Sequence, residues 1–233
     1  MGWDDDELVR DQYRTTANLE TRTAIWDGSA PQDLVISTLR AVASRLVLDA
    51  GAGRGQLAER IRGEVGSRVL ALDASPAMVE ACRARGLDAV RGDVRDLPFA
   101  AGTFDAVVAA WMLYHVSPVE KAVAEFARVL APGGTLIAIT NGRDHLAGLW
   151  RLAGLEHAEP PLSRENGAAT LARHVASLER HDVETVACFA DRATAARYLA
   201  SVGVEDAEER LPSEGWPRTI AGATTVFIGR ATA

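Results

Sequence analysis

The chain has 233 residues, a formal net charge of −7 and 48% hydrophobic residues. This length and composition predict one globular domain spanning residues 1–233, rather than two full domains. The acidic balance disfavours sequence-independent binding to nucleic acid, which requires a basic surface around the phosphates. No apolar run approaches the roughly 18 residues of a membrane span, and the first residues are acidic where a secretion signal would be basic and then apolar. We therefore expect a cytoplasmic protein without membrane partners.

The cysteines and histidines do not form a metal-binding pattern. Cys82 and Cys188 fall in different predicted elements, and the five histidines do not cluster with them. His174 and His181 lack a second ligand three or four residues away. The sequence therefore predicts free thiols and no metal site.

The first predicted element is helical and covers residues 11–27, DQYRTTANLETRTAIWD. Arg14, Asn18 and Arg22 follow at intervals of four, which would place them in one polar stripe of a helix. The stripe is interpreted either as part of a lid or as an ordinary solvated helix face. The candidate lid is the N-terminal helical segment 1–30.

Seven short apolar runs predict strands, and helical stretches separate most of them. The predicted strands are residues 45–50, 67–73, 88–93, 104–111, 134–140, 183–189 and 223–230. Several are apolar on both faces, which is typical of strands covered by helices on two sides. The alternation predicts an α/β fold with a doubly wound, mostly parallel seven-stranded sheet.

Two of the intervening helices carry clear start signals. In the first, Ser75 is a candidate cap and Pro76 occupies the first helical position. In the second, Ser117 precedes Pro118, and Glu120 would complete a capping box with Ser117.

The stretch VLDAGAGRG, residues 47–55, places Gly51, Gly53 and Gly55 after the first strand. Glycines there allow a sharp turn and close approach of a ligand to the backbone. In a doubly wound sheet, ligands lie beyond the carboxyl ends of the strands. The spacing is not the G-x-G-x-x-G of dinucleotide-binding proteins, and Lys121, the only lysine, is too distant for a phosphate-binding loop.

The second strand ends in Asp73, 24 residues after Asp49. An acid at this place can accept hydrogen bonds from both hydroxyl groups of a ribose. The pattern predicts a ribose-containing ligand without a 2′-phosphate. The glycine spacing disfavours the alternative at the level of the fold, an NAD-dependent dehydrogenase.

Four segments together resemble class I S-adenosylmethionine-dependent methyltransferases. They are VLDAGAGRG, LALDASPAM, GDVRDLPFAAGTFDAVVAAWMLYHV and VLAPGGTLIAI, and they span residues 45–140 in the order of that family. The resemblance implies a Rossmann-like methyltransferase fold. It also implies S-adenosyl-L-methionine as the cofactor and S-adenosyl-L-homocysteine as the product.

The resemblance also implies cofactor contacts at matching positions. The residues expected on the methionine and ribose parts are Asp49, Gly51, Ala52, Gly53, Asp73, Ala74 and Ala110. Of these, Asp73 would bind the ribose hydroxyls, and the Ala110 carbonyl would accept from the methionine ammonium.

For the adenine, the resemblance implies that Met78 packs on one face, Asp93 accepts from the exocyclic amine and the Val94 amide bonds a ring nitrogen. Simple core packing remains the alternative for Met78. In related enzymes an N-terminal segment closes over the cofactor, so Tyr13 and Arg22 are candidates to meet the methionine carboxylate.

Methyl transfer from a sulfonium needs a nucleophile held in line and, where the nucleophile carries a proton, a base. His115 follows the fourth strand, near the expected methyl position, and is the first candidate for this base. Tyr114 is a second candidate, and Trp111 is a candidate wall of the substrate site. Packing is the alternative role for His115, and a base need not be present.

Residues 141–182 are longer than a crossover helix requires and predict a helical insertion on the substrate side. His145, Trp150 and His157 are candidates to line the acceptor site, with packing or surface positions as the alternative.

The sequence therefore favours methyl transfer to the O, N or C atom of a small-molecule acceptor, in secondary metabolism or quinone biosynthesis, by a monomer or homodimer. Methylation of RNA or protein is an alternative. It is disfavoured because AAWML replaces the Asn/Asp-Pro-Pro-Tyr/Phe motif of enzymes that methylate nucleic-acid amino groups, and because no basic stripe is present. A protein that binds S-adenosylmethionine without transferring methyl is a third possibility.

Overall fold

The computed structural model describes residues 5–156 and 160–232. An eight-stranded sheet forms its centre, with the strand order β1-β7-β8-β6-β5-β2-β3-β4. The strands that pair in parallel are β2 (Leu46–Ala50), β3 (Arg68–Asp73), β4 (Asp88–Arg91), β5 (Phe104–Ala110) and β6 (Leu130–Asn141). The strands that pair antiparallel are β1 (Trp26–Asp27), β7 (Ser177–Phe189) and β8 (Arg218–Arg230). The predicted doubly wound sheet is confirmed, with the two-residue strand β1 added at one edge.

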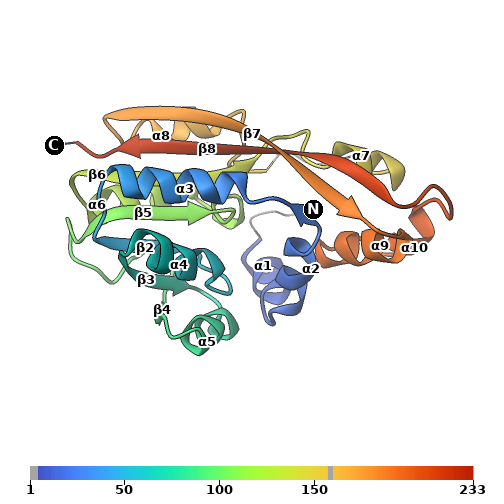
Figure 1. The fold of residues 1–233 in the computed structure, drawn as a ribbon, viewed down its shortest axis with the longest axis horizontal. Coiled ribbons are helices and arrows are strands. Elements are labelled where there is room, and N and C mark those ends of the chain that lie inside the picture. Colours follow the sequence, from blue (N-terminus) through green and yellow to red (C-terminus); the bar gives the residue numbers. More distant parts are fainter. Residues whose placement is uncertain (1–4, 157–159, 233) are drawn as a thin grey trace.

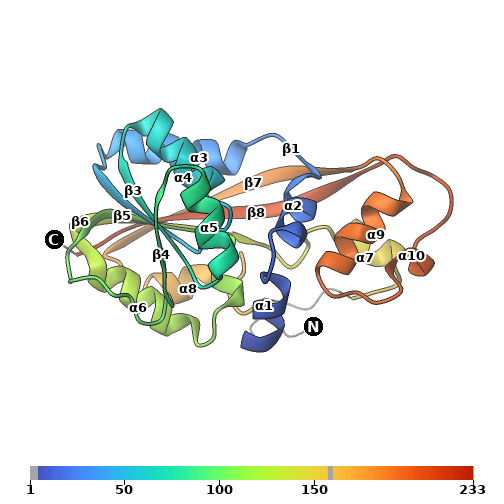
Figure 2. The ribbon, with the colours of Figure 1, turned by 90° about the horizontal axis from the view of Figure 1, so that it is seen from below.

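Helices cover both faces of the sheet (Figures 1 and 2). The elements packed on one face are α3 (Ala30–Ala41), α4 (Gln56–Arg60), the π-helical turn η1 (Ile61–Val65) and α5 (Pro76–Ala84). Those on the opposite face are the 3₁₀ turn η2 (Leu113–His115), α6 (Val119–Val129) and α8 (Gly167–Leu171). Two separate buried apolar clusters result, one on each face of the sheet.

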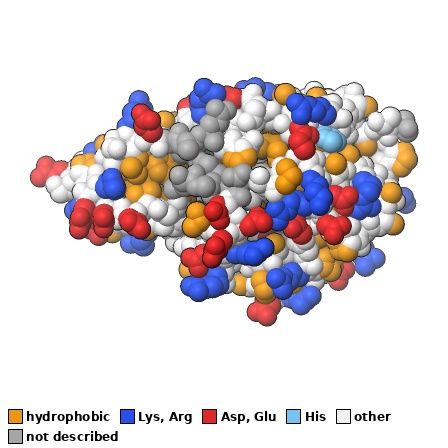
Figure 3. All heavy atoms as spheres, turned by 180° about the vertical axis from the view of Figure 1, so that it is seen from behind, with side chains coloured by type: hydrophobic (Ala, Val, Ile, Leu, Met, Phe, Trp, Pro, Cys, Tyr) orange, Lys and Arg blue, Asp and Glu red, His pale blue; other side chains and the backbone are white. Residues whose placement is uncertain are grey.

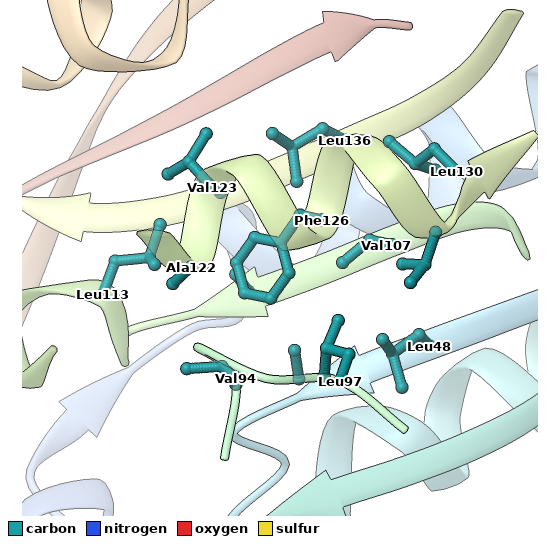
Figure 4. Close-up of a cluster of buried hydrophobic side chains, with 14 of the residues drawn as sticks. Leu48, Val94, Leu97, Val107, Leu113, Ala122, Val123, Phe126, Leu130 and Leu136 are labelled. Carbon is teal, nitrogen blue, oxygen red and sulfur yellow. The ribbon is translucent and has the colours of Figure 1, made fainter. Parts of the chain in front are cut away.

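Phe126 of α6 lies at the centre of one of these clusters (Figure 4). Its ring is fully buried and belongs to the same cluster as Val107 of β5 and Leu97. Full burial of a side chain of this size contributes about 1.5–3 kcal/mol, so this face of the helix fixes α6 against the sheet.

The two predicted helix starts have different outcomes. At α5 the cap is confirmed, because the Ser75 hydroxyl accepts from the Met78 amide at 3.4 Å and Pro76 is the first helical residue. At α6 the predicted capping box is wrong, because Pro118 is the capping residue and no side chain caps the helix. Glu120 instead lies 2.9 Å from His174 Nε2 and also pairs with Arg173, so side chains distant in the sequence hold its carboxylate.

The N-terminal segment forms two short helices rather than one. Helix α1 (Asp6–Gln12) and helix α2 (Ala17–Thr23) are separated by a turn, so the predicted polar stripe does not form. Within this turn region, the Asn18 side-chain nitrogen donates to the Gln12 carbonyl at 3.0 Å, which satisfies a carbonyl at the end of α1. Arg14 lies outside both helices.

The segment after β6 is less helical than predicted. It contains α7 (Ala147–Leu152) and α8, but β7 begins at Ser177 and not at residue 183. The early start has a tertiary cause, because β7 pairs with β8 along its whole length, from Ser177 opposite Arg230 to Phe189 opposite Arg218.

A third apolar cluster lies where β7 and β8 extend beyond the parallel strands (Figure 1). It joins α7 to two further helices, α9 (Arg192–Ser201) and α10 (Ala207–Arg210). Figure 3 shows acidic and basic side chains interspersed over one face of the molecule, without a single basic surface. In the described residues, no helix has the length and apolar character that crossing a membrane requires.

Candidate functional site

A cavity of about 2020 Å³ opens beyond the carboxyl ends of the parallel strands. It brings together most of the residues predicted for the site. From the strand ends and their loops it includes Asp49, Gly51, Ala52, Gly53, Asp73 and Ala74. It also includes Asp93, Val94 and Ala110, together with Tyr13 and Arg22 of the N-terminal segment. Both candidate bases, Tyr114 and His115, line it as well.

The glycine loop after β2 needs its glycines for conformation and for space. Gly51, Gly53 and Gly55 have φ values of +71°, +53° and +77°, in the left-handed region that favours glycine. A Cβ on Gly51 would lie 2.8 Å from Met112 Cβ, and one on Gly53 would lie 2.8 Å from Leu19 Cδ2. Gly51 and Gly53 line the cavity, and a side chain on either one would collide with Met112 or Leu19.

Asp73 anchors this loop and still faces the cavity. Its Oδ2 accepts from the Gly53 amide and its Oδ1 from the Ser75 amide, both at 2.9 Å. Burial raises the pKa of the Asp73 carboxyl, while amide hydrogen bonds, chiefly those of Ser75 and Gly53, act in the opposite direction. Each carboxylate oxygen can accept more than one hydrogen bond, so capacity remains for the two hydroxyl groups of a ribose.

Asp49 is a buried acid whose charge is not balanced. Its side chain is only 2% exposed, and Oδ2 has no hydrogen-bond partner in the described structure. Burial raises the pKa of Asp49 to about 7, the nearby Asp73 adds to the rise, and the Ala58 amide opposes it. A buried carboxylate without a cationic partner is unfavourable, and a cation in the cavity would relieve that cost. With the glycine loop and Asp73, this acid fits the ribose and the positively charged methionine part of S-adenosylmethionine.

Two predicted adenine contacts differ in their surroundings. Met78 is fully buried and does not line the cavity, whereas its neighbour Ala77 does. Met78 is thus packed in the core of the ligand-free structure, and its contact with an adenine stays a prediction. Asp93 lines the cavity, but Arg95 Nη2 donates to its Oδ2 at 2.9 Å and also to Asp6 of α1 at 3.1 Å. This arginine lowers the pKa of the Asp93 carboxyl. An adenine bound here would share the carboxylate oxygens with Arg95.

The turn between α1 and α2 is held against the catalytic candidates by Tyr13. Its hydroxyl lies 2.9 Å from His115 Nε2 and accepts from Arg22 Nη1 at 3.0 Å. Its backbone carbonyl accepts from the Ser75 hydroxyl at 2.7 Å. Arg22 can only donate to this hydroxyl, whereas the direction of the hydrogen bond between Tyr13 and His115 depends on the His115 tautomer. Burial raises the pKa of Tyr13, and the Arg22 charge partly offsets this rise.

Arg22 lines the cavity and is also held by several groups of the protein. Besides Tyr13, it donates to Gln12 Oε1 at 2.9 Å and to the side chain and backbone carbonyl of Ser201 in α9. It therefore ties the N-terminal turn to α9.

Only some of the candidate substrate residues line the cavity. Trp111 and His145 line the cavity, whereas Trp150 is buried in the third apolar cluster. His157 lies outside the described residues. Trp26 also lines the cavity, and its ring is tilted against that of His145, with ring centroids 5.1 Å apart. Sequence reasoning missed Trp26 because its strand has only two residues.

Comparison with known proteins gives consistent matches. A family model described as a methyltransferase domain matches residues 48–138. A demethylmenaquinone methyltransferase of Renibacterium salmoninarum is 31% identical over 182 residues, which are 76% of this chain and 73% of that protein. A ubiquinone biosynthesis O-methyltransferase of Xanthomonas oryzae is 34% identical over 157 residues, covering 60% of this chain and 65% of that protein.

Solved structures share the fold at low sequence identity. The YcgJ protein of Bacillus subtilis has a TM-score of 0.64 at 21% identity, covering 88% of this chain and 99% of that one. The [4+2]-cyclase SpnF has a TM-score of 0.63 at 18% identity, covering 96% of this chain and 95% of that one. At these identities the likeness concerns the fold alone.

Proposed function

The chain belongs to the class I S-adenosylmethionine-dependent methyltransferases, and on that premise we propose that it methylates a small molecule held in the cavity at the carboxyl edge of the sheet. The observation that carries the proposal is Asp49, a buried carboxylate whose Oδ2 lacks a partner, beside the glycine loop and Asp73. Two relatives are named for demethylmenaquinone and for ubiquinone biosynthesis, which supports a small-molecule acceptor. The net charge of −7 also argues against a nucleic-acid substrate.

The main role of the chain's own residues would be to bind the cofactor and to orient the reactants. S-adenosylmethionine, when bound, supplies a methyl group on a positively charged sulfonium. Asp49 would stabilise positive charge in the methionine part, and Asp73 would accept from the ribose hydroxyls. The glycine loop would keep the backbone close to the ligand, and the carbonyl of Ala110, which ends β5 and lines the cavity, would accept from the ammonium. Holding the reactants in a fixed geometry contributes much of the rate in such a transfer.

Residues 1–30 are proposed to act as a lid. The support is the contact of Tyr13 with His115 and Ser75, together with the contact of Arg22 with Ser201. These bonds join the N-terminal turn to the loop after β3, to η2 and to α9. A closed lid would exclude water from the reacting groups.

His115 remains the proposed base where the acceptor carries a proton. In the closed arrangement the Tyr13 hydroxyl lies 2.9 Å from its Nε2, so a proton from the acceptor would reach this nitrogen through the Tyr13 hydroxyl or after this hydrogen bond opens. Of the proposed substrate-side segment 141–182, Asn141 and His145 line the cavity.

The test is transfer of label from methyl-labelled S-adenosylmethionine to components of a cell extract. The variant Asp73→Ala, in which we expect weaker cofactor binding, is the matched control. We expect label in the small-molecule fraction with the unaltered protein and little with the variant. Label confined to RNA or protein would overturn the acceptor class. Cofactor binding without any transfer, across extracts from several sources, would favour the third possibility, a protein that binds but does not methylate.

A further inference from the structure

Part of the cavity is lined by a row of hydrogen-bonding side chains that the proposed cofactor contacts do not include. Trp111 follows β5, Asn141 ends β6, and Thr224 of β8 is the direct pairing partner of Asn141. Thr185 of β7 lies beside Thr224, and all four residues line the cavity.

The hydrogen bonds in this row fix the orientation of the Asn141 amide. Trp111 Nε1 donates to Asn141 Oδ1 at 3.2 Å, and Thr224 Oγ1 donates to the same oxygen at 3.3 Å. An indole nitrogen can only donate, so the atom that receives both bonds must be the carbonyl oxygen. Thr185 lies 3.4 Å from Thr224 Oγ1, and its proton is directed to Thr224 because the Thr224 proton is already used. All three donors therefore lead to Asn141 Oδ1.

The remaining amide group of Asn141 is a donor. In the described part of the chain, Nδ2 makes no hydrogen bond, and it is not among the fully buried unpartnered atoms. Its two protons are thus available to a molecule in the cavity. Such a molecule must offer a hydrogen-bond acceptor, and a ring oxygen is the simplest form.

The neighbouring walls suit a flat ring. Trp111 has a φ of +53°, an unfavourable value for a bulky residue, and strain of this kind is concentrated at functional sites. Trp26 lies against the backbone of β8, because a Cβ on Gly222 would be 2.7 Å from its ring. The imidazole of His145 is next to it, with centroids 5.1 Å apart. Aromatic walls of this kind bind planar apolar groups by stacking and edge contacts.

The charges nearby disfavour an anionic ligand. The charged side chains of β1 and β7 that line the cavity are Asp27 and Glu184, and both are acidic. A carboxylate ligand would be repelled, whereas a carbonyl or hydroxyl oxygen would not.

We infer that Asn141 selects the acceptor: the substrate is an aromatic ring without negative charge whose carbonyl or hydroxyl oxygen accepts from Asn141 Nδ2, with Trp111 and Trp26 lining its site. That the bound ring is the methyl acceptor rests on the proposed function. The preference of the site for such a ring is independent of methyl transfer. Trp111 and Thr224 act as positioning residues, because they hold the Asn141 amide in this orientation.

The test compares 2-naphthol with naphthalene, which share the ring but differ in the oxygen, by calorimetric or ligand-observed NMR titration. The unaltered protein should prefer 2-naphthol on the order of tenfold, as expected for one hydrogen bond in a partly dry site. Asn141→Asp keeps an acceptor for Trp111 and Thr224 but removes the donor, and should reduce the preference to less than about twofold. The control is Thr140→Val, which should keep the preference for 2-naphthol. Thr140 is next to Asn141 but faces the other side of β6, where its hydroxyl donates to the Leu162 carbonyl.

S-adenosylhomocysteine is titrated into the same proteins to measure binding at the cofactor site independently of ring binding. Normal binding of this compound to Asn141→Asp, with loss of the 2-naphthol preference, supports the inference. If the unaltered protein binds S-adenosylhomocysteine but does not distinguish the two rings, or if Asn141→Asp keeps the preference, the inference is overturned and the proposed function stands. If S-adenosylhomocysteine does not bind the unaltered protein, the proposed function fails first.

Discussion

Replacing Asp49 by Asn should make the ligand-free protein more stable and the cofactor complex weaker. The pKa of Asp49 is raised from 3.8 to about 7, chiefly by burial. At about 1.36 kcal/mol per pH unit, the ionised side chain costs the folded state roughly 4 kcal/mol. The sign follows from proton binding, since the folded protein holds this proton between about pH 4 and pH 7 and the unfolded chain releases it. The cost is therefore absent below about pH 4 and complete above about pH 7.

A buried Asn amide retains a desolvation cost of about 1–3 kcal/mol, so we expect Asp49→Asn to gain about 1–3 kcal/mol at pH 8. The gain should shrink towards pH 5 and is measured by urea unfolding at both pH values. Asp33→Asn is the control, because Arg60 lowers the pKa of this exposed carboxyl, and it should gain nothing. Equal stability of Asp49→Asn and the unaltered protein at pH 8 would refute the reasoning.

The same carboxyl predicts how cofactor binding depends on pH. A cation binds the ionised form of Asp49, so affinity for S-adenosylmethionine should rise between pH 5.5 and 7.5, by at most about tenfold per unit below the pKa. The cofactor's α-amino group stays largely protonated in this range. Calorimetry with Asp49→Asn should show weaker binding with a flatter pH profile. An unchanged profile would separate Asp49 from the ligand.

Asp73→Ala should weaken cofactor affinity by about 1.5–3 kcal/mol, as for a hydrogen bond to a charged group, in the same calorimetric titration; unchanged affinity would remove the ribose assignment. Arg22→Ala should expose the N-terminal turn to limited proteolysis and raise the cofactor dissociation rate, because it loses the bonds to Tyr13 and Ser201. The control Arg14→Ala removes only an exposed ion pair and should behave as the unaltered protein. Iodoacetamide should label exposed Cys188 and leave Cys82 intact, as read by mass spectrometry, because burial raises the pKa of the Cys82 thiol to about 12; rapid labelling of Cys82 in the folded protein would contradict the packing described.

The central part of the fold was predictable because its signals are local. Buried strands such as β2 and β5 read as short apolar runs, and α5 carries its cap in its own sequence. The misassigned parts depend on distant partners instead. Strand β7 begins early because β8 pairs with it, and the capping box at Glu120 fails because His174 and Arg173 bind that carboxylate.

The candidate site divides in the same way. The glycine loop and Asp73 are visible in the sequence because strand, turn and acid follow at short spacing. Helical spacing places Met78 on an apolar face but does not say whether that face meets the cavity or the core. Asn141 could not be identified from the sequence, because its environment depends on the antiparallel pairing of β8, which brings Thr224 beside it. No local sequence pattern indicates this pairing.

The most direct test of the account is a crystal structure of the complex with S-adenosylhomocysteine. We expect the ribose hydroxyls on Asp73, the methionine ammonium near Asp49 and the Ala110 carbonyl, and the space bordered by Trp111 and Asn141 left open beside the sulfur. A ligand bound elsewhere, or one whose ribose does not contact Asp73, would contradict the account.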